Sequence, residues 1–122
     1  MTMPPPSSVR ESPTLRELYA AHIGKVSDKW SLYLDVYERV LAPYRDRPVA
    51  FAEIGVQNGG SLELWARYLP KATVLVGCDI DPKCGALAFE DPRIAVVVGD
   101  ANTEAAYRAI LARAPAFDVF VD

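Results

Sequence analysis

Four carboxylates follow apolar runs of strand length in this sequence. They are Glu53, Asp79, Asp100 and Asp122. Because the carboxyl ends of parallel strands meet at one edge of a sheet, we expect these acids to form a lip there. Such a lip favours a ligand that is locally positive or rich in hydroxyl groups over an anionic one.

A loop rich in glycine, EIGVQNGGS at residues 53–61, follows the first apolar run. Glycine adopts positive φ and lets a backbone approach a ligand closely, so this loop indicates a binding site. A pyrophosphate site would need G-x-G-x-x-G, whereas the third glycine is missing here and Glu53 would repel phosphate. Asp79 lies twenty residues after Gly59, the spacing at which an acid reaches ribose hydroxyls in nucleotide-binding folds.

Strand-like and helix-like segments alternate from Val49 onward. The expected strands are 49–54, 73–80, 93–100 and 117–122, and the expected helices are 61–69, 81–89 and 102–114. We expect Asp81 and Asn102 to cap the second and third of these helices. Because the strands show little polar alternation, both faces should be buried, which predicts an α/β fold with a doubly wound parallel sheet.

The part before Val49 should be helical. Residues 1–12, rich in proline and serine, are expected to be a disordered tail, and residues 13–48 an N-terminal helical segment with two leading helices. Thr14 and Glu17 have the capping-box spacing at the start of the first helix. The second helix is expected within residues 30–44 and the first to end at Gly24.

Composition limits the possible roles. The 122 residues, 51% of them hydrophobic, suffice for one small domain. Residues 49–122 carry ten acidic and six basic side chains, which argues against nucleic acid as a partner. Neither an apolar run of membrane-spanning length nor a secretory h-region occurs, so we expect a cytoplasmic protein with no membrane partner. Cys78 and Cys84 are expected to be ordinary thiols.

As an ordered set, EIGVQNGGS, GCDIDP, VVGDA and FDVFVD resemble the four motifs of class I S-adenosylmethionine-dependent methyltransferases. The resemblance covers residues 49–122 and implies a Rossmann-like fold. With KVSDKW upstream, the sequence is similar to a bacterial subgroup near the macrolide-sugar O-methyltransferases and cephalosporin-hydroxylase-like proteins. It implies S-adenosylmethionine as the cofactor and a small-molecule methyl acceptor, with O-methylation of a sugar-like or natural-product hydroxyl.

The resemblance also implies roles in the glycine loop. Glu53 would approach the methionyl ammonium, directly or through water. The loop backbone at Gly55 and Gly59 would pass under the methionine part, and Gln57 and Asn58 would belong to the same cofactor-binding loop.

Further roles are implied at the later strand ends. Asp79 would bind the ribose hydroxyls and Ile80 would pack on the adenine face, while Asp100 and Ala101 would meet the adenine edge. Asp122 matches the acid that holds a divalent cation in metal-dependent members, where Mg²⁺ would lower the pKa of a substrate hydroxyl.

One departure from the family is that its sheets usually have seven strands, whereas four are expected here. We therefore expect the cofactor-binding half of an enzyme, with catalytic residues unassigned. The exposed edge of its fourth strand should favour pairing, for example in a homo-oligomer. An NAD-dependent oxidoreductase and a truncated, non-catalytic binding or assembly domain stay open as alternatives. The segment from His22 to Trp30 is expected to be a solvated loop or, alternatively, a lid over the methionine end.

Overall fold

The computed structural model of the chain describes residues 13–21 and 34–122. The expected tail, the end of the first helix at Gly24 and the segment from His22 to Trp30 lie outside them. In chain order the elements are α2 (Leu15–Ala21), α3 (Leu34–Leu41), η1 (Ala42–Tyr44), β1 (Ala50–Ile54), α4 (Gly60–Tyr68), β2 (Val74–Asp79), η2 (Pro82–Ala86), β3 (Ile94–Val98), α5 (Glu104–Leu111) and β4 (Val119–Val121).

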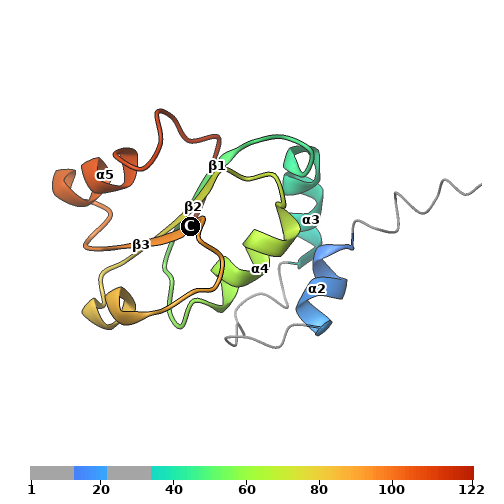
Figure 1. Ribbon diagram of the computed structural model, residues 1–122, viewed down its shortest axis with the longest axis horizontal. Helices are drawn as coiled ribbons and strands as arrows, with labels where there is room; N and C mark the ends of the chain where they lie inside the picture. The colour runs from blue at the N-terminus through green and yellow to red at the C-terminus, as the bar shows by residue number, and fades with distance from the viewer. Residues whose placement is uncertain (1–12, 22–33) are drawn as a thin grey trace, which may run out of the picture.

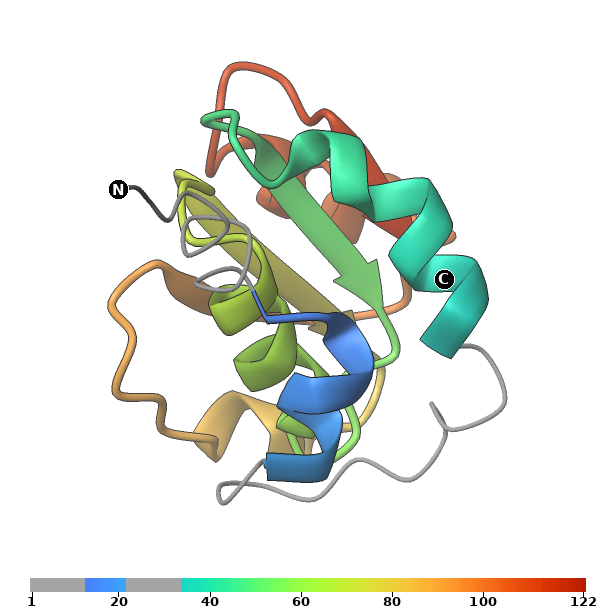
Figure 2. The same cartoon turned by 90° about the vertical axis from the view of Figure 1, so that its right-hand side faces the viewer.

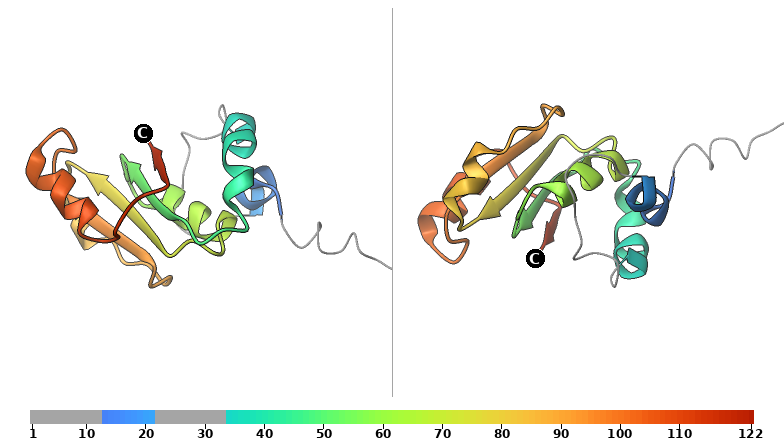
Figure 3. Two further views of the ribbon diagram at one scale, coloured as in Figure 1. Left: turned by 90° about the horizontal axis from the view of Figure 1, so that it is seen from above. Right: turned by 90° about the horizontal axis from the view of Figure 1, so that it is seen from below.

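All pairings in the four-stranded sheet are parallel, in the order β3-β2-β1-β4. Figure 1 labels β1, β2 and β3, and Figure 3 shows β4 beside β1. The chain moves outward from β1 to β2 and β3, then returns to place β4 on the other side of β1. This reversal makes the carboxyl ends of β1 and β4 a topological switch point, where α/β sheets bind ligands. The predicted Rossmann-like fold is confirmed.

Helices cover both faces of the sheet. Figure 3 shows α5 on one side, with α2, α3 and α4 on the other. On the α4 side, Phe51 and Leu75 pack with Trp65, and on the α5 side Ala52 and Val76 pack with other residues from the sheet and α5. Successive strand residues point to opposite faces, which explains why neighbours in sequence belong to different cores.

The leading helices extend the core on the α4 side. The predicted capping box of α2 is confirmed, since the Thr14 amide donates to Glu17 Oε1 at 2.9 Å and the Glu17 amide donates to Thr14 Oγ1 at 3.1 Å. In α3, Glu38 accepts hydrogen bonds from the Leu15 amide and from the Tyr68 hydroxyl. One carboxylate thus joins α3 to α2 and α4, which lie together in Figure 2.

Two predictions about the helices were wrong, one on the type of helix after β2 and one on the residue that caps α5. The helix expected over 81–89 is a short 3₁₀ turn, Pro82–Ala86, although Asp81 does cap it by accepting from the Lys83 amide. Leu87 then leaves in an extended conformation, which ends the turn. Helix α5 is capped by the Thr103 side chain, not by Asn102, whose amide donates to Asp100.

Arg93 closes the C-terminal end of α4. Its guanidinium donates hydrogen bonds to backbone carbonyls at 2.8 to 3.1 Å, those of Ala66, Leu69, Pro70 and Ala72. The same group pairs with Asp91 at 2.6 Å. Of these carbonyls, that of Ala66 belongs to α4, and it lacks its usual partner within the helix because Pro70 has no N–H, so Arg93 stabilises the helix that follows the glycine loop. Within the described part of the chain, no helix is long and apolar enough to cross a membrane.

Candidate functional site

A cavity of about 490 Å³ lies at the carboxyl ends of the strands. All four strands, or the residues that directly follow them, contribute to its wall, together with α5. The lining residues are Ile54, Gly55, Cys78, Asp79, Ile80, Gly99, Asp100, Ala101, Asn102, Tyr107, Ile110, Phe120 and Asp122. This volume is typical of small-molecule sites, and the position is the one expected for a ligand in this fold.

The cavity wall carries three of the four predicted acids, Asp79, Asp100 and Asp122. Among the described residues that line it, none is lysine, arginine or histidine. The electrostatic field at the wall therefore favours a cationic or hydroxyl-bearing ligand over a pyrophosphate.

Asp79 connects this wall to the glycine loop. Its Oδ2 accepts from the amides of Val56 at 2.8 Å and Gln57 at 3.0 Å, and its Oδ1 accepts from the Asp81 amide at 2.9 Å. Burial raises the pKa of Asp79, but these hydrogen bonds outweigh burial and hold the pKa below its ordinary value. A carboxylate offers about four acceptor positions, and besides the three amides the Cys84 thiol also hydrogen-bonds the Asp79 carboxylate.

The glycine loop has the backbone that its sequence predicts. Gly55 and Gly59 have φ of 92° and 89°, where a side chain would be strained. Gln57 also has a positive φ, 53°, which the sequence did not indicate. The Gly55 amide donates to the Cys78 carbonyl at 2.7 Å, and Asn58 Oδ1 accepts from the Gly60 amide at 3.0 Å. Of the loop residues predicted to bind the cofactor, Gly55 lines the cavity.

Glu53 lies away from this cavity. It is 1% exposed, and its Oε1 accepts from the Ser61 hydroxyl at 2.7 Å. Ile54, the next residue of β1, lines the cavity, and alternation along the strand directs Glu53 to the α4 side. The predicted acidic lip therefore has three members at the cavity, with Glu53 below the glycine loop. Its contact with a ligand ammonium stays a prediction.

Ile80, Asp100 and Ala101 come together at the cavity as the sequence predicts. Ile80 is 68% exposed, which is unusual for an isoleucine and leaves its side chain available to a ligand surface. Asp100 Oδ1 accepts from the Asn102 amide at 2.9 Å, a turn that fixes the carboxylate beside Ala101.

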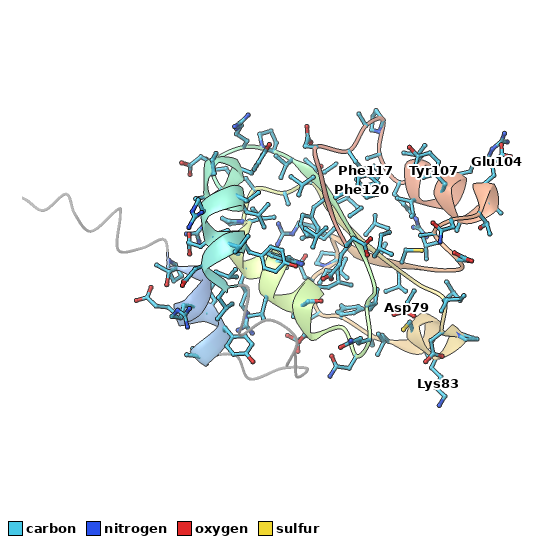
Figure 4. All side chains as sticks on the ribbon, turned by 180° about the vertical axis from the view of Figure 1, so that it is seen from behind. Asp79, Lys83, Glu104, Tyr107, Phe117 and Phe120 are labelled. Atoms are coloured by element: carbon cyan, nitrogen blue, oxygen red, sulfur yellow. The ribbon has the colours of Figure 1, made fainter. Side chains whose placement is uncertain are left out.

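Sequence reasoning missed an apolar side of the cavity. Tyr107 and Ile110 of α5 line it together with Phe120 of β4. Phe120 is 49% exposed, and its ring centroid lies 5.6 Å from that of Phe117 (Figure 4). The signal was available, because Phe120 alternates with the inward-facing Val119 and Val121 along β4.

The sequence predicts that Asp122 holds a divalent cation. Asp122 lines the cavity, as predicted. Across residues 13–21 and 34–122, no group of three histidine, cysteine, aspartate or glutamate side chains is arranged to hold a metal ion. These residues therefore do not form a complete Mg²⁺ site, which needs several oxygen ligands.

Known methyltransferases resemble the chain in sequence. It is 35% identical over 122 positions to 8-demethyl-8-alpha-L-rhamnosyl tetracenomycin-C 2'-O-methyltransferase of Streptomyces olivaceus, an alignment that covers 93% of this chain and 30% of the relative. It is 31% identical over 117 positions to demethylmacrocin O-methyltransferase of Streptomyces fradiae, covering 90% of this chain and 29% of that protein. No family model matches the chain.

The fold of the chain is also similar to that of a solved methyltransferase structure. MycE methyltransferase from the mycinamycin biosynthetic pathway, in complex with Mg, SAH and mycinamycin VI, superimposes with a TM-score of 0.69 and 28% identity. The match covers 89% of this chain and 29% of MycE. The predicted resemblance to methyltransferases is confirmed, and the chain spans less than a third of the length of the relatives that it matches.

Proposed function

We propose that this chain is the cofactor-binding part of an S-adenosylmethionine-dependent O-methyltransferase, and that the whole enzyme methylates a hydroxyl of a sugar or another natural product. The observation that carries the proposal is the cavity at the strand ends, lined by Gly55, Asp79 and Asp100, in a chain aligned with O-methyltransferases over nine-tenths of its length.

The cavity wall suits an adenosyl ligand. Asp79 would accept the ribose hydroxyls, which would share or replace the amide and thiol partners that its carboxylate has in this structure. Ile80 would pack on the adenine face, with Asp100 and Ala101 at the adenine edge. The carboxylates favour the positive sulfonium over the two negative charges of a dinucleotide pyrophosphate, which argues against NAD.

The glycine loop would hold the methionine part. Gly55 and Gly59 keep side chains away from it, and Gln57 and Asn58 form the turn between them. Glu53, which is buried and bonded to Ser61, would reach the ammonium directly or through a bridging water.

The reaction needs the acceptor and the sulfonium to be brought together. The hydroxyl oxygen attacks the methyl carbon, the carbon–sulfur bond breaks as the carbon–oxygen bond forms, and the hydroxyl proton leaves to a base. This chain's contribution is to fix the sulfonium, and holding two reactants in line lowers the barrier substantially. Catalytic residues stay unassigned.

A metal-assisted step is not part of the proposal for this chain. Asp122 could supply one oxygen ligand, but among the described residues no group of three histidine, cysteine, aspartate or glutamate side chains is arranged to hold a metal ion with it. A bound Mg²⁺ would need ligands from a further segment or from the acceptor itself.

The open edge of β4 is the surface best placed for pairing. It is a terminal strand of the sheet, with unpaired backbone groups on its outer side. Further strands of a longer chain or a second copy of this chain would satisfy these groups. The homo-oligomer and the cytoplasmic location stay predictions.

Titration calorimetry of the 122-residue chain tests the function. S-adenosylhomocysteine should bind saturably with one site, whereas NAD should give no saturable heat. Saturable binding of NAD alone would replace the proposal with the oxidoreductase alternative. If neither compound binds or raises the melting temperature, the non-catalytic alternative is favoured.

A further inference from the structure

Gln57 has the least favourable backbone conformation in the glycine loop. Its φ of 53° lies in the left-handed region, which glycine adopts freely and other residues adopt at a cost. Gln57 is exposed, so burial of its side chain does not compensate for this cost. Contacts to the backbone hold this conformation, in addition to the turn bond from the Gly59 amide to the Val56 carbonyl at 2.9 Å.

Two side chains supply these contacts, and both lie in the segment that ends β2 and forms η2. Asp79 Oδ2 accepts from the Gln57 amide at 3.0 Å. Cys84 Sγ donates to the Gln57 carbonyl oxygen at 3.3 Å, and the same thiol also hydrogen-bonds the Asp79 carboxylate. The peptide groups on the two sides of Gln57 are therefore bonded to one segment, and the turn cannot relax without breaking one of these bonds.

Cys84 is suited to stay a donor. It is buried against Val56 and Leu62. Burial raises the pKa of its thiol most, followed by the negative charges of Asp79 and Asp81 and by a hydrogen bond to Asp79. A thiolate could not donate a hydrogen bond, so this environment preserves the contact with the Gln57 carbonyl.

We propose that Cys84 is a positioning residue, whose thiol, with Asp79 on the neighbouring amide, holds Gln57 left-handed and thereby keeps the glycine loop in the form that receives the cofactor. The part that concerns the cofactor rests on the proposed function. The part that concerns the loop rests only on the contacts within the chain.

The test compares Cys84→Val, an apolar and slightly larger side chain without a donor, with Cys84→Ser, which keeps a donor. Amide hydrogen exchange at Val56 and Gln57 is measured by NMR without ligand, and S-adenosylhomocysteine affinity by calorimetry. We expect Cys84→Val to speed exchange at both amides and to weaken binding about threefold to tenfold, the factor for one ordinary hydrogen bond. Cys84→Ser should stay within about twofold of the native chain.

A second background separates positioning from general damage. In Gln57→Gly the left-handed conformation carries no side-chain penalty, so Cys84→Val should there weaken binding by less than about twofold. Equal losses in both backgrounds, or native exchange rates in Cys84→Val, would overturn the proposal. If Cys84→Val does not fold, Cys84→Ala serves as the donor-free variant with the same expectations.

Different results would refute the proposed function and the positioning role of Cys84. If the native chain binds no S-adenosylhomocysteine, the proposed function fails, while the exchange measurement still decides whether Cys84 holds the loop. If the native chain binds S-adenosylhomocysteine but the exchange rates of the Val56 and Gln57 amides are the same in Cys84→Val as in the native chain, only the positioning role is refuted.

Discussion

Replacing Asp79 with asparagine should destabilise the chain measurably. The carboxylate accepts three amide hydrogen bonds, two on Oδ2 and one on Oδ1. Asparagine has one acceptor oxygen, so even its better orientation loses one bond and sets its NH₂ group against a backbone amide. Bonds to a charged group contribute about 1.5 to 3 kcal/mol each, and since Asp79 is half-buried we expect a loss of about 1 to 3 kcal/mol at neutral pH.

Urea denaturation followed by circular dichroism measures this loss as a lower midpoint at unchanged slope. With a slope of about 1 to 2 kcal/mol/M, the midpoint should fall by roughly 1 M. Asp81→Asn is the matched control, because Asp81 is exposed, accepts one amide bond at 3.0 Å and caps a turn that asparagine caps equally well. Its stability should stay within about 0.5 kcal/mol of the native value.

The effect at Asp79 should also depend on pH. Because the folded-state pKa of Asp79 is lowered, its stabilisation is fully present above the ordinary carboxyl value of about 4 and is lost as the pH falls through the folded-state pKa. The difference between the native chain and Asp79→Asn should therefore shrink in acid. Equal stability at pH 7, or a difference that persists unchanged in strong acid, would refute this reasoning.

Three further changes test other contacts. Arg93→Lys should lower the free energy of unfolding, measured in urea, by about 2 to 3 kcal/mol, because lysine cannot reproduce the several donors of the guanidinium. Arg108→Lys is the control: Arg108 pairs with Glu104 on the exposed side of α5, and the change should be less than about 0.5 kcal/mol. Gly77→Ala should cost about 1 to 3 kcal/mol in thermal unfolding, because its Cβ would lie 2.5 Å from Val56 Cγ2; native stability would contradict this. Hydrogen bonding by Arg93 lowers the pKa of Asp91, so Asp91→Asn should make unfolding less steeply dependent on pH in acid, and an unchanged profile would contradict it.

The fold was largely predictable because its signals are local and mutually consistent. Apolar runs without polar alternation marked β1 and β2, which are buried on both faces, and the capping-box spacing of Thr14 and Glu17 marked the start of α2. The turn Pro82–Ala86 was less predictable. A cap followed by proline is compatible with both α and 3₁₀ geometry, and the extended backbone at Leu87 decides between them.

The site was predictable where it depends on strand ends. Asp79, Asp100 and Asp122 meet at the cavity because parallel strands end at one edge. Glu53 differs, since alternation along β1 turns it toward Ser61 on the other face. The bond from Cys84 to Gln57 joins residues 27 positions apart, so only the folded arrangement reveals it.

A crystal structure of the chain grown with S-adenosylhomocysteine tests the central claim most directly. The proposal predicts a ribose hydroxyl within hydrogen-bond distance of Asp79 and the adenine ring against Ile80, inside the cavity at the strand ends. A vacant cavity at saturating ligand, or a ligand bound elsewhere while Asp79 keeps only partners from within the chain, would contradict it.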